Sequence, residues 1–192
     1  MRTLIPTLLI CLVAPAASAL AQDAKPVAAA PATAPDRPPA FNKMAYGFVK
    51  ANLLRSAEKM PEENYGFKPA DTVRSFGQIV GHVADSQYYF CSVALGEKNP
   101  GLKIEQTKTS KADLVASLKD AFAYCDKAYD GMTDASGSEM VKFFNQDMAK
   151  RDVLTGNAMH GVEHYGNLVV YLRMKNIVPP SSEPGMMPGP KK

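Results

Sequence analysis

The segment "NAMHGVEHYGNLVVYLRMKNIVPP", residues 157–180, has the pattern of a long hydrophobic helix that ends at a pair of prolines. It holds two of the three histidines in this chain of 192 residues, His160 and His164. An α-helix turns about 100° per residue, so side chains four positions apart project from one face. Their Cβ atoms lie roughly 6 Å apart, and both imidazoles can therefore reach one ion. On a helix, this spacing is typical of metal ligands.

Several polar side chains accompany the two histidines. Asn157, Asn167 and Tyr171 lie on the same predicted face, where they are placed to line a pocket beside an ion. A polar residue in a helical core can equally be buried because a hydrogen bond satisfies it. Glu163 follows His160 by three residues. It could accept a hydrogen bond from a ligand histidine or act as a general base, and the alternative is a carboxylate in solvent.

The third histidine, His82, lies in a second predicted helix. Ser75 and Gln78 have the spacing of a capping box, and Gly96 is suited to end the helix. His82 falls at the edge of the apolar arc of this helix. Asp85, three residues later, is a second candidate for the hydrogen-bond acceptor or general base, again with a solvated surface carboxylate as the alternative.

Two more segments have helical periodicity. In the segment nearest the N-terminus, apolar residues recur on one expected core face: Phe41, Met44, Phe48, Ala51, Leu54 and Met60. In the segment after residue 110 the spacing is more regular: Leu114, Leu118, Ala121, Cys125, Ala128 and Met132. The fourth helix is expected over residues 148–175. Four amphipathic helices in roughly 140 residues predict an all-α fold, a four-helix bundle.

Two long connections join these helices, "GEKNPGLKIEQTKT" (residues 96–109) and "TDASGSEMVKFFNQ" (residues 133–146). Strand-like alternation competes only weakly, in the "EMVKFFN" part of the second connection. Both are longer than a minimal up-and-down bundle requires, and long loops at one end of a bundle commonly frame a site.

The N-terminal residues have the composition of an export signal. Arg2 precedes an apolar run that is shorter than the roughly 20 residues needed to cross a bilayer, and Ala17, Ala19 and Ala21 give the small-x-small spacing of a cleavage site. We therefore expect a signal peptide over residues 1–21, export to the periplasm or beyond, and no membrane span. An Ala/Pro-rich linker (residues 22–40), the bundle (residues 41–180) and a disordered tail (residues 181–192) complete the predicted organisation.

Charge and cysteine content exclude some partners and some kinds of metal site. The net charge of +3, with acids and bases interleaved, argues against a nucleic-acid partner. Cys91 and Cys125 remain after signal removal and form either one disulfide or two buried thiols. Cys91 is nine residues after His82, about 180° around the helix. It is therefore placed to face the third helix, and a mixed His/Cys metal site is excluded.

A shared cation explains why all three histidines lie on inward helical faces. Each neutral imidazole has two nitrogens to satisfy, so three buried rings without partners are unfavourable. The alternative is that each ring is separately hydrogen-bonded in the core. Three histidine ligands leave at least one coordination position open, as in catalytic rather than structural zinc sites. Zinc is the default metal, and nickel, iron and manganese are alternatives.

The segments "SFGQIVGHVADSQYYFCSVALGE" (residues 75–97) and "HGVEHYGNLVVYLRMKNIVPPSS" (residues 160–182) resemble the DinB-like (damage-inducible, YfiT-like) family of metalloenzymes. The resemblance covers residues 41–182. It implies a four-helix bundle with a divalent metal bound by His82, His160 and His164. Characterised relatives include thiol-dependent transferases and isomerases that use mycothiol or bacillithiol, and relatives often dimerise, so a homodimer is expected.

These observations favour a metal-dependent hydrolase or a thiol or group transferase that acts on a small molecule. A non-catalytic metal-binding or stress-response protein is the first alternative. A metal-free bundle that binds a partner or an apolar ligand is the second. No sequence feature identifies the substrate.

Overall fold

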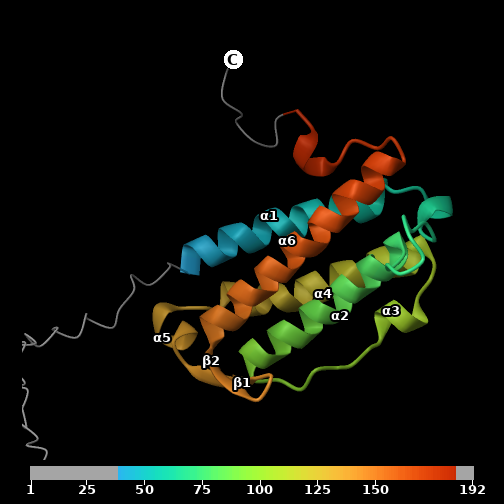
Figure 1. Ribbon diagram of the computed structural model, residues 1–192. Helices are drawn as coiled ribbons and strands as arrows, with labels where there is room; N and C mark the ends of the chain where they lie inside the picture. The colour runs from blue at the N-terminus through green and yellow to red at the C-terminus, as the bar shows by residue number, and fades with distance from the viewer. Residues whose placement is uncertain (1–38, 185–192) are drawn as a thin grey trace, which may run out of the picture. The chain divides into compact units, whose positions relative to one another are not determined.

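Four long helices form the fold in the computed structural model, which describes residues 39–184 (Figure 1). They are α1 (Pro39–Lys59), α2 (Phe76–Leu95), α4 (Lys111–Asp130) and α6 (Lys150–Met174). Helix α1 packs against α4 and α6, and α2 packs against the same two helices. The predicted all-α four-helix bundle is therefore confirmed. Among the described residues, no helix is long and apolar enough to cross a membrane.

The starts and ends of the helices follow the local sequence signals. The Ser75 hydroxyl accepts a hydrogen bond from the backbone N–H of Gln78, and the Gln78 side chain accepts one from the backbone N–H of Ser75. Gly96 ends α2 with a φ of 71°, in the left-handed region that glycine adopts without strain. Ser110 caps α4 by accepting from the N–H of Asp113. The capping signals thus predicted both ends of the second helix correctly, and the third helix begins after residue 110 as expected.

The expected core face of α1 is wrong for most of its residues, although Met60 is buried and Leu54 packs against the core. Phe41, Met44 and Phe48 are 46%, 64% and 41% exposed. The face that packs into the bundle carries a different set of residues, several of them polar: Asn42, Tyr46, Val49, Asn52, Leu53, Ser56 and Ala57. Hydrophobicity alone selected the wrong face because this face also buries polar side chains that form internal hydrogen bonds. Ser56, for example, donates to the Asn52 carbonyl.

A disulfide joins Cys91 of α2 to Cys125 of α4, with the Cα atoms 5.2 Å apart. Both side chains are fully buried, and the Cα separation is within the range that a disulfide requires. Of the two alternatives for these cysteines, the structure contains the bonded pair, and the expected orientation of Cys91 toward the third long helix is correct.

Both long connections contain secondary structure. The first holds the short helix α3 (Ile104–Thr107), and the second holds α5 (Asp134–Gly137) and an antiparallel hairpin of β1 (Met140–Phe143) and β2 (Gln146–Ala149). Phe144 and Asn145 form the hairpin turn with φ values of 47° and 63°. A two-residue turn with two positive φ values usually contains glycine. This turn contains no glycine, so the sequence lacks the usual signal for a hairpin.

The described chain continues past the predicted end of the bundle. After α6, the short 3-10 helix η2 (Pro180–Ser182) packs back on the bundle, and the hydroxyl of Tyr165 donates to Ser181. Glu183 forms ion pairs with Arg55 and Lys59 of α1. Residues 181–183 of the predicted tail thus contact the bundle. The last linker residues, 39–40, belong to α1, whereas the predicted signal peptide and residues 22–38 and 185–192 lie outside the described residues.

Candidate metal centre

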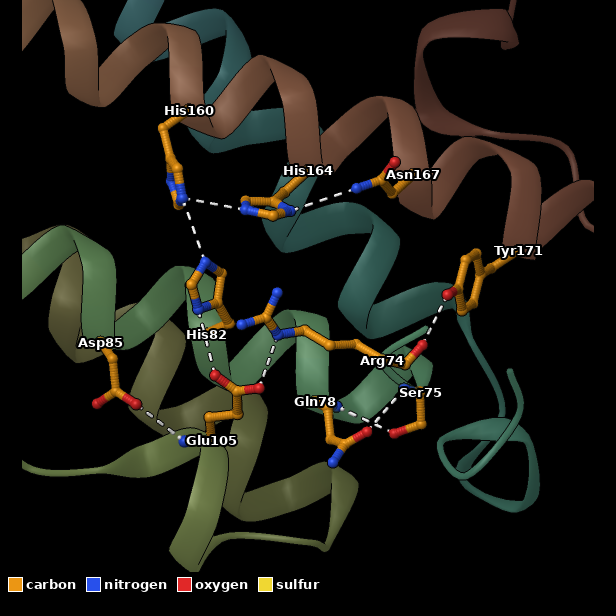
Figure 2. A network of polar contacts seen from close by, with 10 residues as sticks. All are labelled: Arg74, Ser75, Gln78, His82, Asp85, Glu105, His160, His164, Asn167 and Tyr171. Carbon is orange, nitrogen blue, oxygen red and sulfur yellow. Dashed lines mark hydrogen bonds and ion pairs between the residues drawn. The ribbon is translucent and has the colours of Figure 1, made fainter. Parts of the chain in front are cut away.

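The three histidines converge between α2 and α6 (Figure 2). Nε2 of His160 lies 3.2 Å from Nε2 of His82 and 3.0 Å from Nε2 of His164. One nitrogen of each ring lies within 4.8 Å of the others. Two imidazole nitrogens bound to one tetrahedral zinc ion are about 3.3 Å apart. The cluster therefore has the dimensions of a three-histidine metal site.

The electrostatic state of the rings also fits a cation. Burial and the neighbouring His160 and His82 rings lower the pKa of His164 to about 3. Burial and His82 also lower the pKa of His160. Both rings are thus neutral near pH 7 and offer lone pairs. Nε2 of His160 can share one hydrogen bond with only one neighbour at a time, whereas a cation between the rings accepts a lone pair from each.

The second nitrogen of His82 contacts a carboxylate that the sequence did not reveal. Nδ1 of His82 lies 3.2 Å from Oε2 of Glu105, and Oε1 of Glu105 accepts a hydrogen bond from Nε of Arg74 at 2.7 Å. A carboxylate at this position fixes the ring orientation and raises the basicity of the ligand nitrogen. Glu105 comes from the four-residue helix α3, within a segment predicted as a loop.

A glycine lets α3 approach the site. A Cβ atom on Gly81 would lie 2.7 Å from Cα of Glu105 and 2.9 Å from its backbone nitrogen. Such distances are too short for a side chain. Gly81 directly precedes His82, so it is the sequence signal that could have indicated a close backbone approach beside this ligand.

Asp85 has a different role from the one proposed from its spacing. Its carboxylate accepts hydrogen bonds from the backbone N–H groups of Ile104 at 2.9 Å and Glu105 at 3.0 Å. These are the first N–H groups of α3, which have no partner within the helix. Asp85 therefore holds α3 in place, and it is Glu105 that contacts the histidine ring.

Of two further predicted pocket residues on α6, Asn167 lies beside the cluster and Tyr171 lies farther along the helix (Figure 2). Nδ2 of Asn167 is 3.4 Å from Nδ1 of His164. Coordination through Nε2 leaves a proton on Nδ1, so the amide oxygen of Asn167 is then the group that faces the ring. The Tyr171 hydroxyl donates to the Arg74 carbonyl at 2.6 Å, which fixes the backbone next to the site. His160 has no comparable support, because its buried Nδ1 has no hydrogen-bond partner among the described residues.

The other two candidate residues, Glu163 and Asn157, lie in different environments. Glu163 is exposed and lines the rim of a cleft of about 850 Å³ that opens beside His164 and also includes Asn167 and Tyr171. Asn157 lies in the core instead, where it donates to the Gln87 side chain and accepts from the Tyr129 hydroxyl. For Asn157 the structural alternative is therefore the correct one.

The cleft reaches the cluster from one side. Arg74 and Glu105 line it together with His164. Near His160 aromatic rings pack instead: the Phe90 ring lies 5.7 Å from the His160 ring and 5.1 Å from that of Phe143 on the hairpin. The cleft therefore lies on the Arg74 side of the cluster, and the aromatic rings lie on the His160 side.

The fold is that of a family of helical bundle proteins. The model of the DinB superfamily matches residues 45–168, and the chain belongs to this superfamily. The family resemblance of the two histidine segments is thereby confirmed.

Individual relatives agree with this assignment. The uncharacterized protein YjoA of Bacillus subtilis (strain 168) is 27% identical over 123 residues, 61% of this chain and 77% of YjoA. A DinB-like protein of Bacillus cereus ATCC 10987 superposes with a TM-score of 0.64 at 16% identity, over 72% of this chain and 93% of the other. A mutant of the mycothiol-dependent maleylpyruvate isomerase has a TM-score of 0.60 at 14% identity, over 69% of this chain and 61% of that protein. The two solved structures show similarity of fold.

Proposed function

We propose that this protein binds one divalent cation through His82, His160 and His164 and uses it in hydrolysis or in thiol or group transfer on a small molecule. The observation that carries the proposal is the convergence of three Nε2 atoms from two helices, two of them at 3.0 and 3.2 Å from the third. Three protein ligands leave a coordination position for water or substrate. Zinc is the proposed metal because neutral imidazoles are among its usual ligands.

The residues of the chain have distinct parts in this proposal. A bound cation would polarise a substrate group or lower the pKa of a bound water. Glu105 and Asn167 orient the rings of His82 and His164. Phe90 and Phe143 limit solvent on the side away from the cleft. Glu163, which lines the same cleft, is the carboxylate proposed as a base.

A thiol is one candidate substrate group. The maleylpyruvate isomerase of the same fold is named as mycothiol-dependent, and a thiolate is a good ligand for zinc. Export of this chain, which we propose from residues 1–21, would place the site in an oxidising compartment. The Cys91–Cys125 disulfide supports that location, because disulfides persist there.

A non-catalytic metal-binding or stress-response role is the alternative, and the position of the carboxylates favours it. Asp85 is used to cap α3, and Glu105 is shared between His82 and Arg74. Among the described carboxylates near the cluster, only the exposed Glu163 then remains to act as a base. A site without a well-placed base can hold metal without turning over a substrate.

Metal analysis tests the proposal. Purified wild-type protein exposed to zinc should retain about one ion per chain after dialysis, and His164→Ala should lose most of it because one ligand is gone. Met159→Ala is a matched control, since this residue of α6 is 68% exposed. Cobalt substitution separates catalysis from storage: an open coordination position requires the visible spectrum to respond to an added thiol. A wild-type protein that holds no ion, or a spectrum that never responds, contradicts the respective half of the proposal.

A further inference from the structure

Arg74 is the cationic side chain that faces the candidate metal centre across the cleft. Figure 2 shows its guanidinium group beside His82, with the terminal nitrogens directed toward the histidine cluster. Arg74 and His164 line the same cleft. The Arg74 side chain is 46% exposed, so a ligand in the cleft can reach it.

Arg74 is fixed in position at both ends. The Tyr171 hydroxyl holds its carbonyl oxygen, and Glu105 holds its Nε atom. Glu105 is itself held because Asp85 caps α3. Among the described residues, no group accepts a hydrogen bond from either terminal nitrogen of Arg74. The guanidinium is thus pre-organised, with its outer edge available.

An anion in the cleft can bind at the outer edge of the Arg74 guanidinium, because Lys68 and Glu105 nearby are already paired. Lys68 forms its ion pair with Asp71, 3.8 Å away on the rim. Glu105 binds the inner side of Arg74 and contacts His82 at the same time. A cation held by the histidines would add further positive charge on the inner side of Arg74. A ligand that bridges the two positive centres therefore carries negative charge at the Arg74 end.

We propose that the terminal nitrogens of Arg74 bind a carboxylate of the substrate while a second group of the same molecule occupies the open coordination position. The planar fork of an arginine matches the two oxygens of a carboxylate and forms two parallel hydrogen bonds. The substrate class is therefore a small carboxylic acid that also carries a metal-binding group such as a thiol. This inference rests on the proposed function, because it needs the metal to be bound.

Glu105 links the two residues that would act on the two ends of such a substrate. One of its oxygens contacts the metal-ligand histidine and the other contacts the recognition arginine. A change in the position of Arg74 is thereby transmitted to His82 through a single carboxylate. Glu105 is a positioning residue in this arrangement, and Arg74 is the residue that distinguishes charged from neutral ligands.

A pair of matched thiols tests the inference on protein loaded with cobalt(II). The probes are 3-mercaptopropionate and 3-mercaptopropan-1-ol, in which an alcohol replaces the carboxylate. The thiolate-to-cobalt absorption reports the binding of each. We expect wild type to bind the carboxylate probe about tenfold more tightly. Arg74→Gln should bind both probes with Kd values within about twofold of each other. Arg74→Lys should keep only part of the preference, because an ammonium lacks the fork.

Lys68→Gln is the control for general electrostatic attraction. It also removes a positive charge from the cleft, yet it should retain most of the preference. If cobalt does not bind, or neither thiol changes the spectrum, the proposed function is wrong and this inference is wrong with it. If both thiols bind wild type equally, or if Arg74→Gln keeps the preference, the proposed function stands and only the role of Arg74 is wrong.

Discussion

Glu105 joins His82 to Arg74: its two oxygens lie 3.2 Å from Nδ1 of His82 and 2.7 Å from Nε of Arg74. The link ties a candidate metal ligand to the residue that faces the cleft. It comes from a short helix in a connecting segment, not from one of the four long helices. The bundle therefore supplies the ligands, and a connection supplies the group that orients one of them.

Removal of Glu105 should weaken metal binding without unfolding the protein. Loss of a carboxylate that orients a metal-ligand histidine typically lowers metal affinity about 10- to 100-fold, and we expect Glu105→Ala to fall in this range. Competition with a chelating dye measures the change, and circular dichroism checks the fold. Glu58→Ala removes an exposed carboxylate paired with Lys119 and should bind metal as wild type does. Equal affinity in wild type and Glu105→Ala would show that the contact with His82 is incidental.

Gly81→Ala should damage both stability and the site. The added methyl group would meet the Glu105 backbone at 2.7 and 2.9 Å, so α3 must move away from α2. We expect a loss of about 1–3 kcal/mol in the free energy of unfolding, measured by urea denaturation, together with weaker metal binding.

Gly166→Ala is the matched control for Gly81→Ala. It is also a helix-interior glycine, but nothing lies within 4 Å of a Cβ atom there. Alanine at such a position should stabilise the protein by about 0.5–1 kcal/mol. If the two substitutions change the stability in the same direction, close approach of α3 is not the reason for glycine at position 81.

The disulfide should contribute stability and leave the metal centre unaffected. Cys91 and Cys125 are separated by 34 positions, and closing a loop of this size stabilises the fold by about 4 kcal/mol in the chain-entropy model. The double variant Cys91→Ala, Cys125→Ala should therefore unfold at lower urea concentration. Its zinc stoichiometry should match wild type, since both sulfurs are on the opposite side of α2 from His82. A loss of bound zinc in a folded variant would contradict this separation.

Residues with a local or periodic signal could be predicted, and residues positioned by tertiary contacts could not. The i, i+4 spacing of His160 and His164 and the cap at Ser75 follow from helix geometry alone. The contact between Glu105 and His82 spans 23 positions and depends on how α3 packs, which no periodicity encodes. Arg74, just before α2, was not identified for the same reason.

The core face of α1 was predicted incorrectly for a different physical reason. A hydrophobicity pattern assumes that apolar residues are inside, yet Tyr46 is buried and its ring stacks on Tyr129 at 3.8 Å. Its hydroxyl lies within hydrogen-bond distance of two acceptors, the Phe122 carbonyl and the Asp126 carboxylate. Phe48, two positions later, is exposed. Such faces are decided by specific hydrogen bonds, which become visible only in the folded structure.

Two asparagines of α6, both predicted as pocket residues, should respond oppositely to substitution. Asn157→Ala leaves the buried Gln87 side chain without its partner, although the Tyr129 hydroxyl keeps the Leu154 carbonyl as an acceptor, so the free energy of unfolding should fall by about 1–3 kcal/mol. Asn167→Ala removes the exposed amide beside Nδ1 of His164, so metal affinity should fall about tenfold with little change in stability. Urea denaturation measures the stability of both variants, and competition with a chelating dye measures their metal affinity. A large stability loss in Asn167→Ala, or weakened metal binding in a folded Asn157→Ala, would show that the roles assigned to the two residues are interchanged.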